Sequence, residues 1–396
     1  MPRHEYSLAP IAAFAAPLLF SAPALGGQDL DQPDDSGLEA EFLIDNEFFV
    51  GLQGDEGDAA TWSSELELEL GLDFEAMLGW SGWAAGMVAK ANRGDALAAS
   101  SGETLAFSGA ADDRGELVEE LWLQKHFAKD RISFLLGRYA ADNDFDVREA
   151  ADVFVNAGFE EGPELAEAGG DGGAVVPLPG LGARLNLAIT PGLAFRIAVI
   201  EGDTEEVDPD APADEGYFYI AELDWSPSQS PETRVGLGVW HHTGDFQRLI
   251  EQADASFKTG VSGYYAFAEG PIYHGRQNPD LVVSAFARIG LTDDEVAAID
   301  SHRAIGLVVG GLIPQRADDR LGLGLTSISN SSDYRRASVL EGEPISDRET
   351  AIELTYIIQA TDWLIVQPTL QCALNRDGDP EVARACAAGL GLRLEF

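Results

Sequence analysis

The chain ends in Gly389-Leu390-Gly391-Leu392-Arg393-Leu394-Glu395-Phe396, where apolar residues alternate strictly with small or charged ones. Successive side chains of a β-strand point to opposite faces, so the even positions form an apolar face and the odd positions a polar face. A soluble protein turns its apolar face toward a core, whereas a membrane barrel turns it toward lipid and lines a wet lumen with the other face. A terminal Phe on such a strand is typical of bacterial outer-membrane barrels, and the rest of the chain has to decide between the two folds.

The same alternation returns along the chain and is clearest at residues 63–76. Five carboxylates on one parity of this segment must meet water, and five large apolar side chains on the other must meet lipid or a core. After residue 24, no apolar run approaches the roughly 20 residues that a membrane-spanning helix requires. Such a chain can cross a bilayer only as a closed barrel, whose strands satisfy one another's backbone hydrogen bonds. Further alternating segments lie at 181–187, 193–199, 217–225, 281–289, 352–359 and 364–371.

Connections between the expected strands alternate in length. Short turn signals at 128–130, 190–192, 314–319 and 360–362 alternate with long, acidic segments. Short periplasmic turns and longer outer loops are the layout of an outer-membrane barrel, and an even strand number leaves both termini in the periplasm. We therefore predict an all-β fold, a transmembrane antiparallel up-and-down β-barrel of about 16 strands. The expected strands are 38–50, 63–76, 83–92, 115–127, 131–139, 180–189, 193–202, 216–226, 233–242, 257–268, 280–290, 303–313, 320–328, 347–359, 363–374 and 386–396.

The longest connection, residues 140–179, follows the fifth expected strand. A connection of this length inside a compact fold usually has a functional reason. General porins fold an outer loop inward at this position to narrow the pore, so we predict a long, inward-folded third outer loop. The other long connections are expected near 51–62, 93–114, 203–215, 243–256, 291–302, 329–346 and 375–385.

The first residues have the features of a signal peptide. Arg3 supplies a basic start, residues 8–20 form a short apolar core, and small residues suited to cleavage follow. A membrane helix is disfavoured because the run is short and contains two prolines. We predict three parts of the chain: a signal peptide at residues 1–24 that is removed on export, a short acidic lead-in at 25–37, and a single barrel in the bacterial outer membrane at 38–396.

Charge and cysteine content narrow the partners. The formal net charge of −43, from 68 acidic against 25 basic residues, excludes a nucleic-acid partner. The acids occur mainly in loop-like runs without EF-hand spacing, so we expect no dedicated metal site and no cofactor. Cys372 and Cys386 lie near the ends of the last two expected strands. In an exported chain this pair suggests a disulfide, and two lipid-facing thiols are the alternative.

Patterns of catalytic sites are missing from the sequence. His241 and His242 are adjacent in an expected strand and point to opposite faces, so they cannot chelate one metal together. No nucleophile-elbow, Walker or zinc-helix pattern occurs. An outer-membrane hydrolase would need a lipid-facing Ser-His pair with an orienting partner, which the six scattered histidines do not display. We therefore predict that the chain is not an enzyme.

Six segments in a common order carry a family resemblance. They are Leu136-Gly137-Arg138 with Asp144-Phe145, Ala221-Glu222-Leu223, the run from Gly310 to Gly322, Glu353-Leu354-Thr355-Tyr356, Gln367-Pro368-Thr369-Leu370-Gln371, and the run from Gly391 to Phe396. In this order and spacing the chain resembles the carbohydrate-selective porin family of the OprB type. The resemblance implies a sixteen-stranded outer-membrane pore that admits sugars through an eyelet of arginines, acids and aromatic residues.

A sugar path sets physical requirements on its lining residues. It needs polar groups that hydrogen-bond pairs of hydroxyls and flat aromatic faces for the C–H side of the ring. Binding must stay weak, because a site that holds its substrate cannot conduct. Sixteen strands leave room for a water-filled channel. The candidates, chosen for lumen parity or for their place at the start of the long loop, are Glu120, Trp122, Gln124, Arg138, Asp142, Asn143, Asp144, Arg184, Arg196, Glu222, Asp224, Trp240, Arg288, Glu353, Gln367, Gln371 and Arg393.

The main hypothesis is a porin for passive diffusion of mono- and oligosaccharides through a weakly binding, water-filled pore. Its alternative is a general cation-preferring or other small-solute porin. An anion channel, which needs a cationic ladder, and a soluble exported β-sandwich binding protein are less favoured. Expected partners are sugars, outer-membrane lipid and lipopolysaccharide, and the barrel-assembly machinery, which would recognise Phe396. Both a monomer and a homotrimer fit the sequence.

Overall fold

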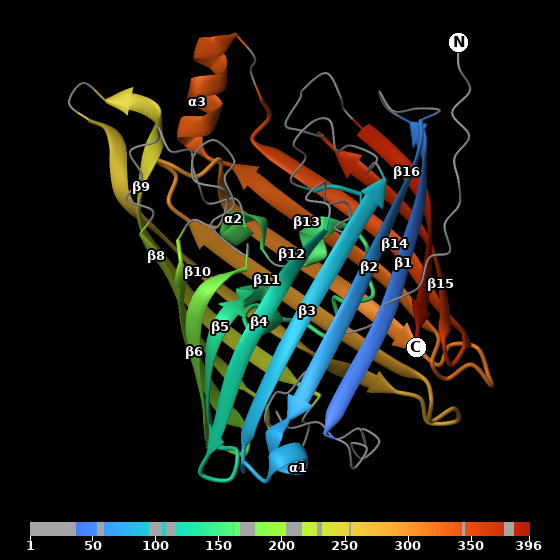
Figure 1. The fold of residues 1–396 in the computed structure, drawn as a ribbon. Helices are drawn as coiled ribbons and strands as arrows, with labels where there is room; N and C mark the ends of the chain where they lie inside the picture. Colours follow the sequence, from blue (N-terminus) through green and yellow to red (C-terminus); the bar gives the residue numbers. More distant parts are fainter. Residues whose placement is uncertain are drawn as a thin grey trace, which may run out of the picture.

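A closed barrel of sixteen strands makes up the computed structural model, from β1 (Leu38–Gln53) to β16 (Arg384–Glu395), which pair with each other and close the sheet (Figure 1). Every strand pairs antiparallel with its neighbours in the sequence, which confirms the predicted fold class. None of the helices within the described ranges has the length and apolarity of a membrane span. The structure describes residues 37–53, 59–94, 105–107, 116–160, 162–166, 179–202, 216–227, 232–252, 255–342, 345–375 and 384–396.

The remaining elements follow in chain order. The strands are β2 (Ala60–Asp73), β3 (Trp83–Gly94), β4 (Glu116–Phe127), β5 (Ile132–Tyr139), β6 (Gly180–Thr190), β7 (Leu193–Glu201), β8 (Tyr217–Trp225), β9 (Arg234–Gln252), β10 (Ala255–His274), β11 (Val282–Thr292), β12 (Ile299–Gly310), β13 (Arg320–Asn330), β14 (Arg348–Thr361) and β15 (Leu364–Leu374). The helices are α1 (Phe74–Leu78), η1 (Ala141–Asn143), η2 (Ala157–Phe159), α2 (Pro163–Ala166) and α3 (Ser332–Glu341). The predicted signal peptide and most of the predicted lead-in lie outside the described residues.

The two faces of the wall differ as the alternation predicts. Leu121, Leu136 and Ile305 are more than half exposed on the outward face, although they are large and apolar. Carboxylates such as Glu69 and Glu353 alternate with apolar residues and point inward. Large apolar side chains therefore cover the outside of the barrel, as in a membrane barrel. They do not pack against one another in a dry centre.

The structure departs from the expected strands in several places, and three of these departures have a clear physical cause. The predicted connection 243–256 is largely strand, because β9 and β10 continue as a hairpin beyond the rest of the wall (Figure 1). Polar residues of this hairpin form ion pairs, such as Lys258 with Glu295 at 3.3 Å, so it needs no apolar alternation. The second expected strand ends early because the Asp73 carboxylate accepts a bond from the backbone N–H of Glu75 and starts α1. A register shift in the pairing of β3 with β4 lets Glu119, which breaks the alternation, form an ion pair with Lys90.

The end of the wall that carries the short turns holds a group of exposed aromatic side chains. Trp80, Trp83, Trp225 and Trp363 all lie beside these turns and are exposed. The ring of Trp363 stacks on the ring of Phe396, with centroids 6.2 Å apart. This is where an interfacial girdle belongs in a membrane barrel.

Cys372 and Cys386 face each other across β15 and β16 and form a disulfide, which confirms the pairing suggested by the sequence. Leu370 and Leu390, which share the parity of Cys372 and Cys386 on these strands, are exposed on the outward face. The bridge therefore belongs to the outward face and joins the final two strands, with no part in the lumen.

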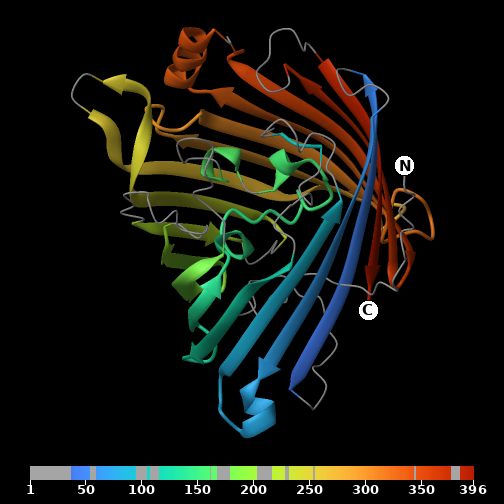
Figure 2. The same ribbon diagram turned by 45° about the horizontal axis from the view of Figure 1, so that its top comes forward.

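The β5–β6 connection packs against the inside of the barrel. The inner faces of β7, β8 and β10 present apolar side chains, among them Ile200, Phe218 and Phe267, and these pack against Phe145 and Leu165 of this connection. A second cluster joins the loop to β11 and β12. Seen from the rim, the described part of this connection lies within the barrel outline (Figure 2). Residues of β1 to β3, β15 and β16 line a cavity that remains between loop and wall.

Candidate functional site

The first part of the β5–β6 connection is held by Asp144. Its carboxylate forms an ion pair with Arg184 and accepts a hydrogen bond of 2.6 Å from the Tyr139 hydroxyl. Arg196 donates to the backbone carbonyl of Asp144 at 2.7 Å. Burial opposes ionisation of Asp144, but the two guanidinium groups outweigh it and hold the pKa of the carboxyl below its usual value. The loop therefore enters the barrel through a contact in which the Asp144 carboxylate is paired with a buried guanidinium group.

A buried ion cluster holds the middle of the loop. Arg288 on β11 lies 2.7 Å from a carboxylate oxygen of Asp146 and 2.7 Å from one of Glu164, and all three side chains are fully buried. Arg148 binds the other side of Asp146 at 2.5 Å. A guanidinium group that bridges two carboxylates stabilises this geometry only because each charge is paired.

Carboxylates of the wall also cap backbone N–H groups of the loop. Glu269 accepts from the N–H of Ala150 at 2.8 Å. Glu353 on β14 accepts from the N–H of Val155 at 3.0 Å and from that of Asn156 at 2.9 Å. A loop inside a barrel needs such partners, because its backbone groups are removed from water. These inward carboxylates of the wall thus accept hydrogen bonds from the backbone of the loop. Without the loop they would contact water.

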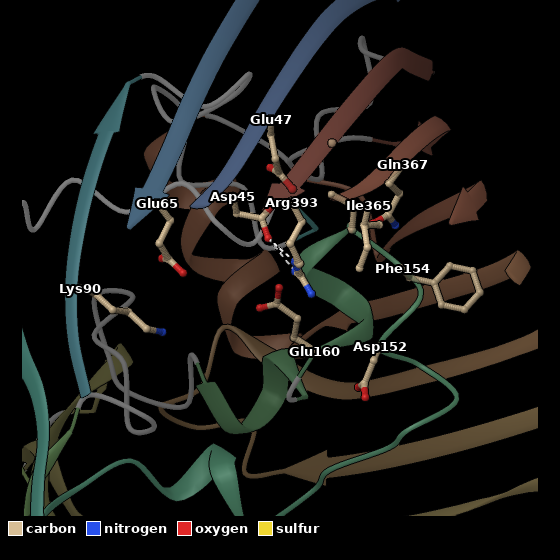
Figure 3. Close-up of a pocket in the computed structure, with 12 residues that line it drawn as sticks. Asp45, Glu47, Glu65, Lys90, Asp152, Phe154, Glu160, Ile365, Gln367 and Arg393 are labelled. Carbon is tan, nitrogen blue, oxygen red and sulfur yellow. Dashed lines mark hydrogen bonds and ion pairs between the residues drawn. The ribbon is translucent and has the colours of Figure 1, made fainter. Parts of the chain in front are cut away.

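A cavity of about 320 Å³ lies between the loop and the opposite part of the wall (Figure 3). Strands from both ends of the chain form its outer side, and the loop segment 152–160 forms its inner side. The side chains of Glu65, Lys90 and Glu160 point into the space between loop and wall (Figure 3). The lining residues are Asp45, Glu47, Glu65, Lys90, Asp152, Phe154, Val155, Glu160, Ile365, Gln367, Gly391 and Arg393.

Carboxylates outnumber cations in this cavity by five to two. Arg393 lies directly opposite Asp45 in the pairing of β16 with β1 and binds its carboxylate at 2.6 Å. Lys90 binds Glu119 at 2.9 Å and Glu67 at 3.3 Å, both just outside the cavity lining. Both cations are thereby neutralised, and the space between loop and wall has a negative potential.

Asp152 is the loop carboxylate of the lining whose pKa is raised toward the neutral range. It lies on the loop and its side chain is exposed to the cavity. Loss of surrounding water raises the pKa of its carboxyl to about 6, although Arg148 opposes the shift. The charge of the cavity therefore changes between pH 7 and pH 5.

The structure brings together only two of the predicted path residues at the cavity, Gln367 and Arg393. Most of the others have the expected inward parity but are buried, away from this cavity. Several of them, such as Glu222 and Glu353, bind backbone N–H groups of the loop. The buried residues are Glu120, Gln124, Arg184, Arg196, Glu222, Asp224, Trp240, Arg288, Glu353 and Gln371.

The remaining candidates lie elsewhere. Asp142, Asn143 and Asp144 belong to the first turn of the loop, where Asn143 donates to Glu120 at 2.8 Å. Trp122 is half-buried against the apolar cluster and donates its indole N–H to Glu120 at 3.0 Å. Arg138 stands opposite Leu121, a strongly exposed outward residue, and therefore does not face the lumen. Trp122 and Trp240 were expected to offer aromatic faces to a sugar ring. Both side chains pack in the apolar cluster between the loop and the wall instead.

Most of the lining residues were not among the sequence-based candidates. Asp45, Glu47, Glu65 and Lys90 have inward parity on the first three strands, which was the available signal. Asp152 and Glu160 lie in a loop without periodicity, so no pattern identifies them. The Phe154 ring points away from the cavity and packs on Phe159 and Phe286, at centroid distances of 4.4 Å and 5.8 Å (Figure 3).

Among the described residues, no group of three or more His, Cys, Asp or Glu side chains could hold a metal ion. His241 is exposed and bonds Ser262, whereas His242 is buried and bonds the carbonyl of Gly202. The two rings thus take opposite faces, as the strand geometry predicts.

Comparisons with known proteins agree with this architecture. The chain is 22% identical to Porin B of Pseudomonas aeruginosa over 311 residues, which cover 70% of this chain and 68% of that protein. It is 21% identical to the putative porin QuiX of Acinetobacter baylyi over 417 residues, which cover 93% and 92% of the two chains. The high-pH structure of Pseudomonas putida OprB is similar with a TM-score of 0.82 and 20% identity, over 91% of this chain and 95% of that one.

A second line of comparison is the family itself. The family model for the carbohydrate-selective porin, OprB family, matches residues 58–396, which include fifteen of the sixteen strands and every part of the loop described above. The chain therefore belongs to the carbohydrate-selective porin, OprB family.

Proposed function

We propose that this outer-membrane porin lets carbohydrates diffuse passively through the cavity between the 152–160 loop segment and the wall of β1 to β3, β15 and β16. The observation that carries the proposal is this cavity of about 320 Å³, which lies where strands and loop approach each other and is lined mainly by polar side chains. Its volume suits a small ligand. The family to which the chain belongs supports sugars as the solutes.

Recognition in the proposed path depends on hydroxyl groups. The Arg393–Asp45 pair and Gln367 offer donors and acceptors side by side, in the arrangement that pairs of sugar hydroxyls require. Ile365 is the apolar lining residue contributed by the wall. Since each contact is open to water, binding stays weak, which conduction demands.

The excess of carboxylates adds a charge preference to this path. Five acids against two paired cations disfavour anionic sugars such as uronates and sugar phosphates. We propose that neutral sugars pass readily and that cationic amino sugars pass at least as well. The same charge pattern favours a second candidate function, a cation-preferring pore for small solutes in general.

Liposome swelling with purified protein tests the proposal. Neutral mono- and disaccharides should enter liposomes that contain the porin, and uronates of equal size should enter more slowly. Replacing Gly391 by Leu should slow sugar entry strongly, because a side chain there projects beside Gln367. Gly310→Leu is the matched control, since nothing lies within 4 Å of the position of its Cβ.

Two results would contradict the proposed path. Sugar entry that is unchanged in Gly391→Leu would place the route elsewhere. Ion conductance without any sugar uptake would favour the general cation-preferring pore. Reversal potentials in planar bilayers separate these cases, because anion selectivity would contradict both.

A further inference from the structure

The outward face of β12, β13 and β14 carries a compact polar patch. Its residues stand in two rows across the three strands, and the second row lies nearer the outer loops. Cross-strand neighbours in such rows are about 5 Å apart, so the side chains lie beside one another, with both arginines exposed and two of the serines buried. This patch, called the Arg-Ser patch below, consists of Arg303, Ser327 and Thr350 in the first row and Ser301, Ser329 and Arg348 in the second.

The patch lies where the lipid-facing surface ends. The next row away from the outer loops contains Ile305, Leu325 and Ile352, all of them exposed on the outward face. The row after it is again aliphatic and exposed, with Leu307, Leu323 and Leu354. An outward-facing position just beyond such rows is the level of lipid head groups in the outer leaflet.

Among the described residues, no acidic side chain pairs with either guanidinium group of the patch. Arg303 contacts the hydroxyls of Ser301 and Ser329, at 3.4 Å each. Within the described part of the chain, no carboxylate lies within 4.0 Å of the guanidinium group of Arg303 or Arg348. By contrast, Arg184, Arg196 and Arg288 inside the barrel each bind at least one carboxylate. Arg303 and Arg348 thus bring two positive charges without a paired carboxylate in the described residues to one small surface.

Hydroxyl groups lie between the two arginines. The Ser329 hydroxyl stands directly beside Arg348 in register, whereas Ser327 donates to the backbone carbonyl of Glu349 and Ser301 donates to Asp300 at the edge of the patch. Neighbouring strands are about 4.8 Å apart, so Arg303 and Arg348 flank the serines of β13 at about 10 Å across the sheet. Two arginine forks with a hydroxyl between them match the oxygens of a phosphate group.

We propose that the Arg-Ser patch binds the phosphorylated head group of an outer-leaflet lipid, whose acyl chains then lie along the aliphatic rows. The lipid is the source of the phosphate because the patch faces outward, away from the lumen, and continues into lipid-facing surface. This inference is independent of the solute that the pore conducts.

Native mass spectrometry of the purified porin in detergent tests the inference. The probes are a bisphosphorylated glycolipid of the lipid A type and the same lipid after removal of its phosphates. The phosphorylated lipid should bind about tenfold more tightly, as expected for two arginines near a phosphate. Arg303→Gln/Arg348→Gln should lose this difference, and Arg303→Lys/Arg348→Lys should keep part of it.

The matched control removes two positive charges elsewhere. Arg276 and Arg336 are exposed on a periplasmic turn and on α3, so Arg276→Gln/Arg336→Gln should bind the lipid as the parent does. Heat-dependent migration on gels verifies that each variant is folded. Equal binding of both lipids, or unchanged binding in Arg303→Gln/Arg348→Gln, would overturn the inference. Displacement of the lipid by millimolar inorganic phosphate would assign the patch to the free anion and overturn it as well.

Discussion

Arg393 and Asp45 stand directly opposite each other where the last strand pairs with the first, and their charged groups are 2.6 Å apart. The pair is partly exposed to the cavity, with 44% of the Arg393 side chain accessible. Partly exposed pairs contribute about 0–1 kcal/mol to stability. Its importance therefore lies in the charge that it presents to a passing solute.

Replacing Arg393 by Gln removes one of the two cations of the cavity and leaves all five carboxylates. The ratio of potassium to chloride permeability should rise by about two- to fivefold, because the local potential becomes more negative. Reversal potentials across planar bilayers measure the ratio. Arg276→Gln, on a periplasmic turn, has the same charge change and should leave it unaltered. A ratio unchanged in Arg393→Gln would show that the current takes another route.

Glu353→Ala should loosen the loop without unfolding the barrel. The substitution deprives the buried N–H groups of Val155 and Asn156 of their shared acceptor, at a cost of about 1–3 kcal/mol for each unpaired group. Mean single-channel conductance and its fluctuations should increase. Glu353→Gln keeps one acceptor oxygen and should show a smaller effect. A conductance identical to that of the parent would contradict the anchoring role.

Selectivity should depend on pH through Asp152. Its raised pKa of about 6 means that the carboxyl is mostly charged at pH 7 and mostly neutral at pH 5. Cation preference should therefore fall as pH drops through about 6, in the direction opposite to that of Arg393→Gln. Asp152→Asn should have a lower preference than the parent at pH 7 and about the same preference at pH 5, so the step should be clearly smaller. A step of the parent's full size in Asp152→Asn would assign it to another group.

Arg288→Met should destabilise the loop strongly. It leaves the fully buried carboxylates of Asp146 and Glu164 without their shared partner, and breaking a buried pair in this way costs about 3–5 kcal/mol. Limited proteolysis should cut within the β5–β6 connection of the variant while the barrel retains heat-dependent migration. Arg288→Met/Glu164→Gln removes one uncompensated charge and should recover part of the resistance. Resistance equal to the parent's in Arg288→Met would contradict the role of the cluster.

Alternation with period two was sufficient to predict the barrel. The outward positions of each strand that meet lipid must be apolar, as Leu390 and Leu392 are on β16. The pattern within a single strand therefore predicts the fold of the whole chain. The pattern fails at β9 and β10, where the hairpin leaves the lipid and apolar side chains are no longer required.

The candidate site was less accessible to sequence reasoning. Inward parity correctly places Glu222 and Glu353 on the inner face, but it cannot tell a residue that meets water from one that meets the loop. That distinction depends on contacts between residues far apart in the chain, such as Glu353 with Val155. Apolar inner positions such as Phe218 and Ile220 were a local sign that part of the lumen is filled.

The Arg393–Asp45 pair joins the two ends of the described chain, and this has a consequence for biogenesis. Asp45 lies on the first strand and Arg393 on the last, so the pair forms only when β16 docks on β1. Closure of the barrel and completion of the proposed path are therefore one event.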